Sequence, residues 1–296
     1  MTIRSIAPYA LPTAADLPQD KVSWNVDPAR AVLLIHDMQD YFVGFYGAAN
    51  PAIVGCIDRI VRLKRHLKAL GVPVVYTAQP PVQSDADRGL LNDLWGPGLT
   101  AKPDLAGIVA PLAPDADDRV LTKWRYSAFF RAPLAEMMAE SGRDQLLICG
   151  IYAHIGVMQT ALDAFMRGIK PFLIADAIAD FSREDHMMAL RYVARNAGRT
   201  IHSDSVLAAP AAVLSKEGLR RILLASLDDT SGDEVPGDDD NLMDFGLDSI
   251  AVMQVVDRWK AAGVEVGFAE LAAQPSINGW WALIEPRLAA SGRVAA

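Results

Sequence analysis

The chain has 296 residues, of which 51% are hydrophobic and 22% are charged, a composition typical of a globular protein with room for two domains. The net charge of −8 is uneven: residues 1–214 contain 21 Lys and Arg against 22 Asp and Glu, whereas residues 215–296 contain 7 against 14. This acidic end argues against nucleic acid as a partner. No apolar run reaches the roughly 18 residues of a membrane span, and the N-terminus does not resemble a secretory signal. We therefore expect a cytoplasmic protein, with Cys56 and Cys149 as buried free thiols.

Strand-like and helix-like segments alternate through the first two thirds of the chain. The continuous apolar run AVLLIH at 31–36 is typical of a strand buried on both faces. Apolar residues at three- and four-residue spacing then predict a helix that ends at Gly71. Further strands are predicted at 72–78, 119–122, 145–152 and 171–177, and further helices at 156–168 and 182–198. The alternation predicts an α/β fold with a mainly parallel sheet that helices cover on both faces.

The last third of the chain has a different pattern. Small residues and a proline follow the last of these helices, and we interpret 209–215 as a linker between a domain at 1–208 and a domain at 216–296. Four helical patterns follow, at 216–227, 249–263, 268–274 and 277–290. They predict a small four-helix domain.

Ser249 opens the second of these four helices, after an acidic loop. The predicted buried face of this helix consists of Val252, Val255, Val256 and Trp259. Serine is a favoured N-cap, so capping is the simplest interpretation of Ser249. However, the segment DFGLDS at 244–249 and the helical module around it resemble the acyl and peptidyl carrier proteins. The resemblance implies that Ser249 receives phosphopantetheine, and a helix N-terminus suits a phosphodiester.

Polar side chains follow three of the strands predicted in the first domain. Asp37, Gln79 and Lys123 come directly after the strands at 31–36, 72–78 and 119–122. Ligands of open parallel sheets bind beyond the carboxyl ends of the strands. Asp37 could instead be a loop acid or a helix cap, and Lys123 a solvated strand end. If the strands are neighbours, Asp37 and Lys123 lie at one edge of the sheet.

Three segments, LLIHDMQDYF, TKWRYSAF and CGIYAHIGVMQTALDA, resemble the isochorismatase-like hydrolase superfamily over about residues 25–210. That superfamily includes cysteine hydrolases with an Asp, Lys and Cys triad. The resemblance places Asp37 and Lys123 on the first two triad positions and Gly156 on the third. Without a thiol at residue 156 no thioester can form there, and Cys149 lies seven residues earlier within a predicted strand. The segment at 79–91 also lacks the histidine of the metal-binding members, so no metal is expected.

Glycine at the third position is similar to the isochorismatases proper, which cleave a vinyl ether without a covalent nucleophile. The resemblance implies that Asp37 is a general acid that protonates carbon, and that Gly156 leaves space and offers a backbone N–H. The other residues implied to contact the substrate are Gln79, Arg88, Lys123 and Tyr152 as polar groups, with Phe42 and Trp95 as apolar walls. Core packing is an equal alternative for Phe42 and Trp95.

Two further expectations concern the charges and the histidines around this site. We expect His36 and His154 to be structural. An ammonium beside Asp37 favours its carboxylate, whereas a general acid must carry a proton. We expect two substrate carboxylates and the exclusion of water to favour the protonated form, so that turnover declines as the pH rises.

The fusion of the two domains resembles the bifunctional isochorismatase and aryl carrier proteins of catechol siderophore assembly lines. This implies isochorismate as substrate, with dihydrodihydroxybenzoate and pyruvate as products. It also implies a phosphopantetheinyl transferase, an aryl-adenylating enzyme, a condensation domain and a second copy of the chain as partners. Three alternatives stay open: a hydrolase that acts on an amino analogue of isochorismate, an amidase, or an inactive scaffold with a carrier domain.

Overall fold

The computed structural model describes residues 4–211, 216–224, 227, 236–261 and 264–290. The chain divides into two compact units, Met1–Val206 (the first unit) and Leu207–Ala296 (the second unit). In the described ranges, no helix is both long enough and apolar enough to cross a membrane.

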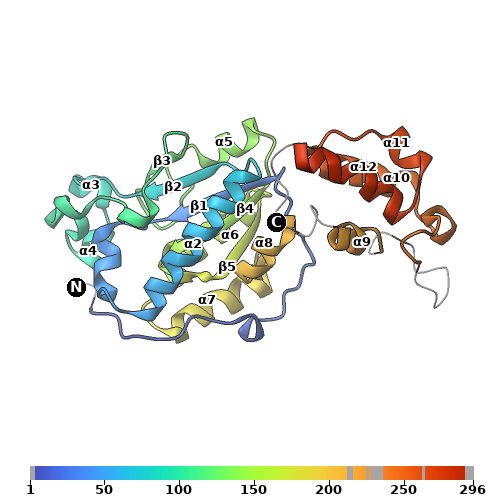
Figure 1. The fold of residues 1–296 in the computed structure, drawn as a ribbon. Helices are drawn as coiled ribbons and strands as arrows, with labels where there is room; N and C mark the ends of the chain where they lie inside the picture. The colour runs from blue at the N-terminus through green and yellow to red at the C-terminus, as the bar shows by residue number, and fades with distance from the viewer. Residues whose placement is uncertain (1–3, 212–215, 225–226, 228–235, 262–263, 291–296) are drawn as a thin grey trace. The chain divides into compact units, whose positions relative to one another are not determined.

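The first unit is built on a six-stranded sheet in which all neighbouring strands run parallel, in the order β3-β2-β1-β4-β5-β6 (Figure 1). The strands are β1 (Ala31–His36), β2 (Val74–Ala78), β3 (Arg119–Thr122), β4 (Gln145–Ile151), β5 (Lys170–Ala179) and β6 (Arg199–Ile201). The five predicted strands are confirmed. The sequence did not reveal β6, because three residues are too few to display a pattern. From β1 the chain adds β2 and β3 on one side of the sheet, and it then returns to add β4 on the other side of β1. Because the strand order reverses between β1 and β4, a crevice is expected at their carboxyl ends.

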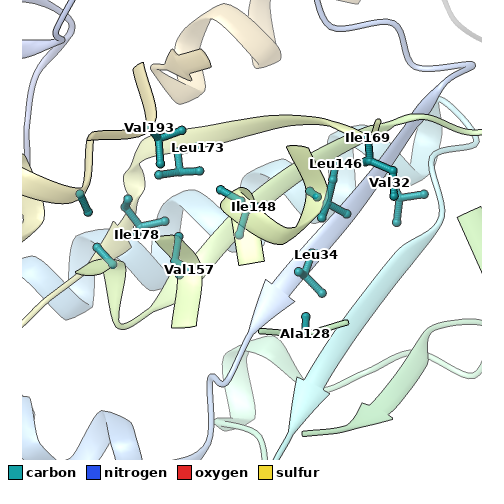
Figure 2. Packing of buried hydrophobic residues seen from close by; sticks show 14 of the residues in the cluster. Val32, Leu34, Ala128, Leu146, Ile148, Val157, Ile169, Leu173, Ile178 and Val193 are labelled. Atoms are coloured by element: carbon teal, nitrogen blue, oxygen red, sulfur yellow. The ribbon is translucent and has the colours of Figure 1, made fainter. Parts of the chain in front are cut away.

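Helices cover the sheet on both faces, as the continuous apolar strands predicted. The helices of the first unit are α1 (Asp40–Val43), α2 (Pro51–Ala69), α3 (Asp85–Arg88), α4 (Leu91–Trp95), α5 (Leu134–Glu140), α6 (Met158–Met166) and α7 (Arg183–Asn196), and α8 (Ser203–Ala211) begins in the first unit and ends in the second. Residues of α5, α6 and α7 share one apolar cluster with β1, β4 and β5. Figure 2 shows part of this cluster, in which Leu34 and Ile148 of the sheet lie with Val193 of α7. Figure 1 shows α2 crossing the opposite, near face.

Local sequence explains where the long helices begin and end. The side chain of Asn50 accepts a hydrogen bond from the N–H of Ala52 at the start of α2. Gly71, at φ +72°, follows the end of that helix as predicted. The hydroxyl of Ser182 accepts from the N–H of Asp185 and caps α7. These caps satisfy backbone N–H groups that a helix leaves without internal partners.

The second unit is a helical bundle of α9 (Lys216–Leu224), α10 (Ser249–Ala261), α11 (Phe268–Ala273) and α12 (Ile277–Ala290). Its core includes the face of α10 that the sequence predicted, from Val252 to Trp259, packed with Trp280 of α12. The indole Nε1 of Trp280 donates to the carbonyl of Leu271 at 2.8 Å, so this buried polar atom has a partner.

The segment between the two predicted domains differs from the prediction at its start. Helix α8 continues to Ala211, so the first three residues of the predicted linker 209–215 are helical. Residues 212–215 lie outside the described residues.

Candidate active site and carrier serine

Asp37 and Lys123 lie at the same edge of the sheet although their strands are not neighbours. Strand β2 lies between β1 and β3. The last residue of β1, His36, pairs with Thr77 of β2, and the last residue of β3, Thr122, pairs with Ala78 of β2. The N–H of Asp37 donates to the carbonyl of Thr77 at 3.2 Å, and the N–H of Lys123 donates to the carbonyl of Ala78 at 2.9 Å. These backbone contacts align the two residues on either side of β2, so that their side chains meet.

Both oxygens of the Asp37 carboxyl group are held. Oδ2 accepts from the Lys123 Nζ at 3.1 Å, and Oδ1 accepts from the Thr77 Oγ1 at 2.6 Å. The backbone of Asp37 has φ +51°, in the left-handed region. This conformation is uncommon for a residue other than glycine, and such strain clusters at functional sites. The two bonds and the backbone together fix the position of the carboxyl group.

Burial makes the charges of this pair interdependent. The side chain of Lys123 is only 3% exposed and that of Asp37 only 10%. Burial lowers the pKa of Lys123, and the charge of Asp37 opposes that effect. Removing one partner would leave a buried charge without compensation. Each charge of the pair therefore compensates the other.

A cavity opens beside the pair. It is lined by all eight residues predicted from the sequence, namely Asp37, Phe42, Gln79, Arg88, Trp95, Lys123, Tyr152 and Gly156. The structure thus brings the predicted residues to one place, while the role of each stays a prediction.

Positive charge predominates in the cavity. Arg88, Lys123 and Arg125 line it together with a single acidic side chain, that of Asp37. Arg88 is 3% exposed, and its guanidinium donates to the Asn92 side chain at 2.9 Å and to the Gly96 carbonyl at 2.6 Å. Burial lowers the pKa of Arg88. Within the described part of the chain, no carboxylate forms an ion pair with it. This surplus of positive charge favours an anionic ligand.

Three of the predicted binding residues already use hydrogen-bonding groups within the protein. The hydroxyl of Tyr152 donates to the carbonyl of Phe42 at 2.7 Å, so it can offer a ligand only an acceptor. The indole N–H of Trp95 donates to the hydroxyl of Tyr126 at 2.9 Å. Gln79 accepts from the side chain of Gln83 at 3.3 Å through its Oε1. Its amide NH2 group is therefore the part that can donate to a substrate oxygen.

Gly156 lies in a π-helical turn, Ala153–Val157, rather than at the first residue of α6. The carboxylate of Asp180 accepts from the backbone N–H and from the ring Nδ1 of His154, at 2.7 and 2.6 Å. It thereby fixes the start of this turn, a structural contact of the kind expected for His154. The sequence pattern of the helix did not reveal the turn, because its bonds depend on a residue from the end of β5.

No thiol lines this cavity. Cys149 lies within β4, and its Sγ donates to the carbonyl of Leu34 at 3.3 Å. Cys56 lies in α2, and both thiols are free and buried, as predicted. Burial raises the pKa of each, which opposes formation of a thiolate. The cavity therefore offers an acid and cations but no sulfur nucleophile.

Several residues of the site were missed from the sequence. Thr77 holds the Asp37 carboxyl group, and Arg125, Tyr126 and Phe181 line the cavity. Thr77 lies next to the last residue of β2, and the other three lie within four residues after a strand. The rule that selected Asp37 would have found Arg125, Tyr126 and Phe181 if it had been applied beyond the first residue after each strand and to β5.

Ser249 is the exposed first residue of α10. The cap of this helix is Asp248, whose Oδ1 accepts from the N–H of Ala251 at 2.7 Å. The interpretation of Ser249 as the N-cap is therefore wrong, because the neighbouring acid performs that function. Gly246, at φ +88°, ends the short 3-10 helix Leu242–Phe245 just before it. This arrangement fits phosphopantetheine, since it leaves an exposed hydroxyl at the N-terminus of a 13-residue helix.

Each of the two units matches a known protein family. Residues 31–205 match the isochorismatase domain family, and residues 218–284 match the phosphopantetheine attachment site family. The chain is 53% identical over 284 residues to enterobactin synthase component B of Escherichia coli K12, covering 96% of this chain and 98% of that protein. It is 48% identical over 303 residues to an isochorismatase of Bacillus subtilis, covering 97% and 96%.

A solved structure shows the same fold for the first unit. A cysteine hydrolase from Pseudomonas syringae is similar with a TM-score of 0.57 and 22% identity, covering 64% of this chain and 96% of that one. The family matches, together with relatives that align over nearly the whole length, show that the chain belongs to the isochorismatase family and carries a C-terminal phosphopantetheine carrier domain.

Proposed function

We propose that the first unit hydrolyses the vinyl ether of isochorismate to 2,3-dihydro-2,3-dihydroxybenzoate and pyruvate. The observation that carries this proposal is the buried Asp37–Lys123 pair in a cation-rich cavity that no thiol lines. Isochorismate has two carboxylates, which suit the three cationic side chains. Its vinyl ether needs an acid rather than a nucleophile. Relatives with this two-part organisation include an enterobactin synthase component and an isochorismatase.

Asp37 is the general acid in this mechanism. Its carboxylic acid proton passes to the terminal methylene carbon of the enolpyruvyl group, which becomes a methyl group, and the adjacent carbon becomes an oxocarbenium centre. Water adds to that centre and returns a proton to the Asp37 carboxylate. The resulting hemiketal then breaks the C–O bond to the ring, which releases pyruvate and the diol. Lys123 and Thr77 stabilise the carboxylate that forms after the first step, because they contact its two oxygens.

The other predicted residues would bind the substrate. Arg88 and Lys123 carry the charges that attract the two carboxylates, and the Gln79 amide is a donor for a further oxygen. Tyr152 would accept from a ring hydroxyl, since its own proton is already donated within the protein. Phe42 and Trp95 would be the apolar walls. Gly156 would offer its backbone N–H, while the space beside its Cα holds the His36 ring.

The test is pyruvate release from isochorismate, measured with lactate dehydrogenase. We expect release by the purified full chain. The proposal would be overturned if isochorismate gave no pyruvate, or if ammonia appeared from nicotinamide or another amide while isochorismate stayed intact. Release from an amino analogue alone would also overturn it, because the site would then require an amino group in place of the ring hydroxyl.

For the second unit we propose that Ser249 is the residue that bears phosphopantetheine, whose thiol carries an aryl group as a thioester when it is attached. The exposed hydroxyl, left free of capping by Asp248, supports this. Incubation with coenzyme A and a phosphopantetheinyl transferase should raise the intact mass by one phosphopantetheine group. Ser249→Ala should remove the gain, and Ser276→Ala in the same unit should keep it. A gain that survives Ser249→Ala would place the attachment elsewhere.

We also propose the setting in which the two units act. An aryl-adenylating enzyme would load the aryl group and a condensation domain would remove it, as expected for synthesis of a siderophore in the cytoplasm. The acidic charge of the second unit would favour basic docking surfaces on these partners. The proposed domain limits remain 1–208 and 216–296, and the proposed assembly is a homodimer.

A further inference from the structure

We propose that His36 determines the reaction class of this site, because its imidazole occupies the volume that any side chain at residue 156 would need. His36 would thus be a specificity-determining residue, because beside its ring only glycine fits at position 156. The inference rests on the proposed function, in which Asp37 acts as an acid and residue 156 supplies no nucleophile.

The geometry of Gly156 carries this inference. A Cβ atom built on Gly156 would lie 2.2 Å from Cε1 of the His36 ring, 2.8 Å from Nε2 and 3.2 Å from Nδ1. Carbon atoms of real side chains do not approach other heavy atoms this closely, so a side chain here requires the ring to move. The backbone of Gly156 is not in the left-handed region that favours glycine. The need for glycine therefore comes from the imidazole and not from the main chain.

The imidazole has little freedom to move away. His36 is 1% exposed, and its Nδ1 lies 2.8 Å from the carbonyl oxygen of Ile151 at the end of β4. Its backbone is enclosed as well: a Cβ on Gly150, at φ +104°, would lie 2.2 Å from the His36 carbonyl oxygen. His36 is thus fixed from β4 at both its ring and its main chain.

The ring is uncharged and has one unused acceptor. Burial lowers the pKa of His36 to about 4. A carbonyl can only accept, so the Nδ1 carries the proton and donates to Ile151. In the described part of the chain, Nε2 then has no hydrogen-bond partner although it is buried. His36 also lines the cavity, and its Nδ1 lies 3.7 Å from the Asp37 Oδ2. A neutral ring thus lies beside the acid, where a cysteine hydrolase would need a thiol.

A double-mutant cycle between Gly156→Ala and His36→Ala tests the coupling. Gly156→Ala adds a single Cβ, so in the full chain it should lower Tm by roughly 5 °C through overpacking. In the His36→Ala background the same substitution should have little further effect, because the space is open. Pyruvate release should be compared within each background: Gly156→Ala should lower it relative to the chain with His36, and should lower it little further relative to His36→Ala, whatever the activity of His36→Ala itself. If Gly156→Ala alone fails to fold, recovery of folded protein in the double variant replaces the Tm comparison.

Gly44→Ala is the matched control, since a Cβ there would meet nothing within 4 Å and the backbone is right-handed. It should leave Tm almost unchanged in both backgrounds. The inference is wrong if Gly156→Ala lowers Tm no more than Gly44→Ala does. It is also wrong if Gly156→Ala lowers Tm equally with and without His36. Wild-type pyruvate release reports on the proposed function separately, so failure of either idea can be distinguished.

A thiol introduced at residue 156 adds a chemical readout. Gly156→Cys combined with His36→Ala should give a folded protein in which iodoacetamide modifies the new thiol, while Cys56 and Cys149 stay protected by burial. Peptide mass analysis locates the label. Gly156→Cys with His36 intact should be either destabilised or unlabelled at residue 156. Equal stability and labelling in both backgrounds would contradict the inference.

Discussion

The two units place their functional groups in opposite environments. In the first unit, Asp37, Arg88 and Lys123 are each less than 8% exposed, and each is held by contacts from other strands or turns. In the second unit, Ser249 is exposed, and a neighbouring residue performs the capping that would otherwise occupy it. Acid catalysis gains from exclusion of water and fixed geometry. A carrier residue must instead be reached by several enzymes in turn. The four substitutions below probe this contrast, from the largest expected effect to the smallest.

Asp37→Asn should give the largest effect. The amide keeps the shape of the side chain but has no acidic proton, so kcat for isochorismate should fall by about 10³-fold. Phosphopantetheine loading of Ser249 should be unchanged, because Ser249 lies in the other unit. Asp40→Asn, at an exposed position three residues later, is the control. Substantial activity in Asp37→Asn would remove Asp37 from the mechanism.

Arg88→Met should weaken substrate binding. Methionine fills similar space without a charge, so the cavity loses one of its three cations and KM should rise about 10- to 100-fold. The exposed Arg131, paired with Asp87, gives the control Arg131→Met. Steady-state pyruvate release at varied isochorismate concentration separates KM from kcat. An unchanged KM would show that Arg88 does not contact a substrate carboxylate.

Acid should destabilise the first unit more than the second, since the three histidines whose pKa is lowered by burial, His36, His66 and His186, all lie in the first unit. Burial lowers the pKa of His186 to about 4. Between the unfolded pKa of about 6.5 and pH 4, the unfolded chain binds the extra proton, so stability falls as the pH falls. The contribution of His186 is about 3 kcal/mol, present above pH 6.5 and lost toward pH 4.

His186→Gln should reduce this acid sensitivity. The ring of His186 contacts the Tyr9 hydroxyl at 3.1 Å and the Ala175 carbonyl at 3.0 Å, and glutamine can replace one of these bonds without titrating. The measurement is the urea midpoint of the full chain at several pH values from 4.5 to 7. If the urea midpoint of the variant fell with decreasing pH as steeply as that of the wild type, His186 would not be the titrating group.

Thr77→Val should have the smallest effect of the four. Valine has nearly the same shape but cannot donate to the Asp37 Oδ1, so kcat should fall about 10-fold while the fold is kept. Thr122→Val, at the exposed end of β3, is the control. A wild-type kcat in Thr77→Val would show that the Lys123 contact alone is enough to hold the carboxyl group.

Local patterns made much of the site predictable. Asp37, Gln79 and Lys123 could be selected because each directly follows an apolar strand, and the parallel topology gathers such residues at one edge. Arg88 and Trp95 lie on short helices without a clear pattern, and they were selected from the family resemblance alone. Thr77 could not be selected in this way, because its contact with Asp37 depends on the pairing of β1 with β2.

The sequence by itself determined the alternation of elements, the buried face of α10 and the absence of a thiol at residue 156, since these are properties of residue type and spacing. Only the tertiary structure decided that Asp248 rather than Ser249 caps α10, and that the ring of His36 fills the space beside Gly156. The physical reason is that hydrogen-bond angles and excluded volume depend on where atoms from separate segments lie, which spacing along one segment does not specify.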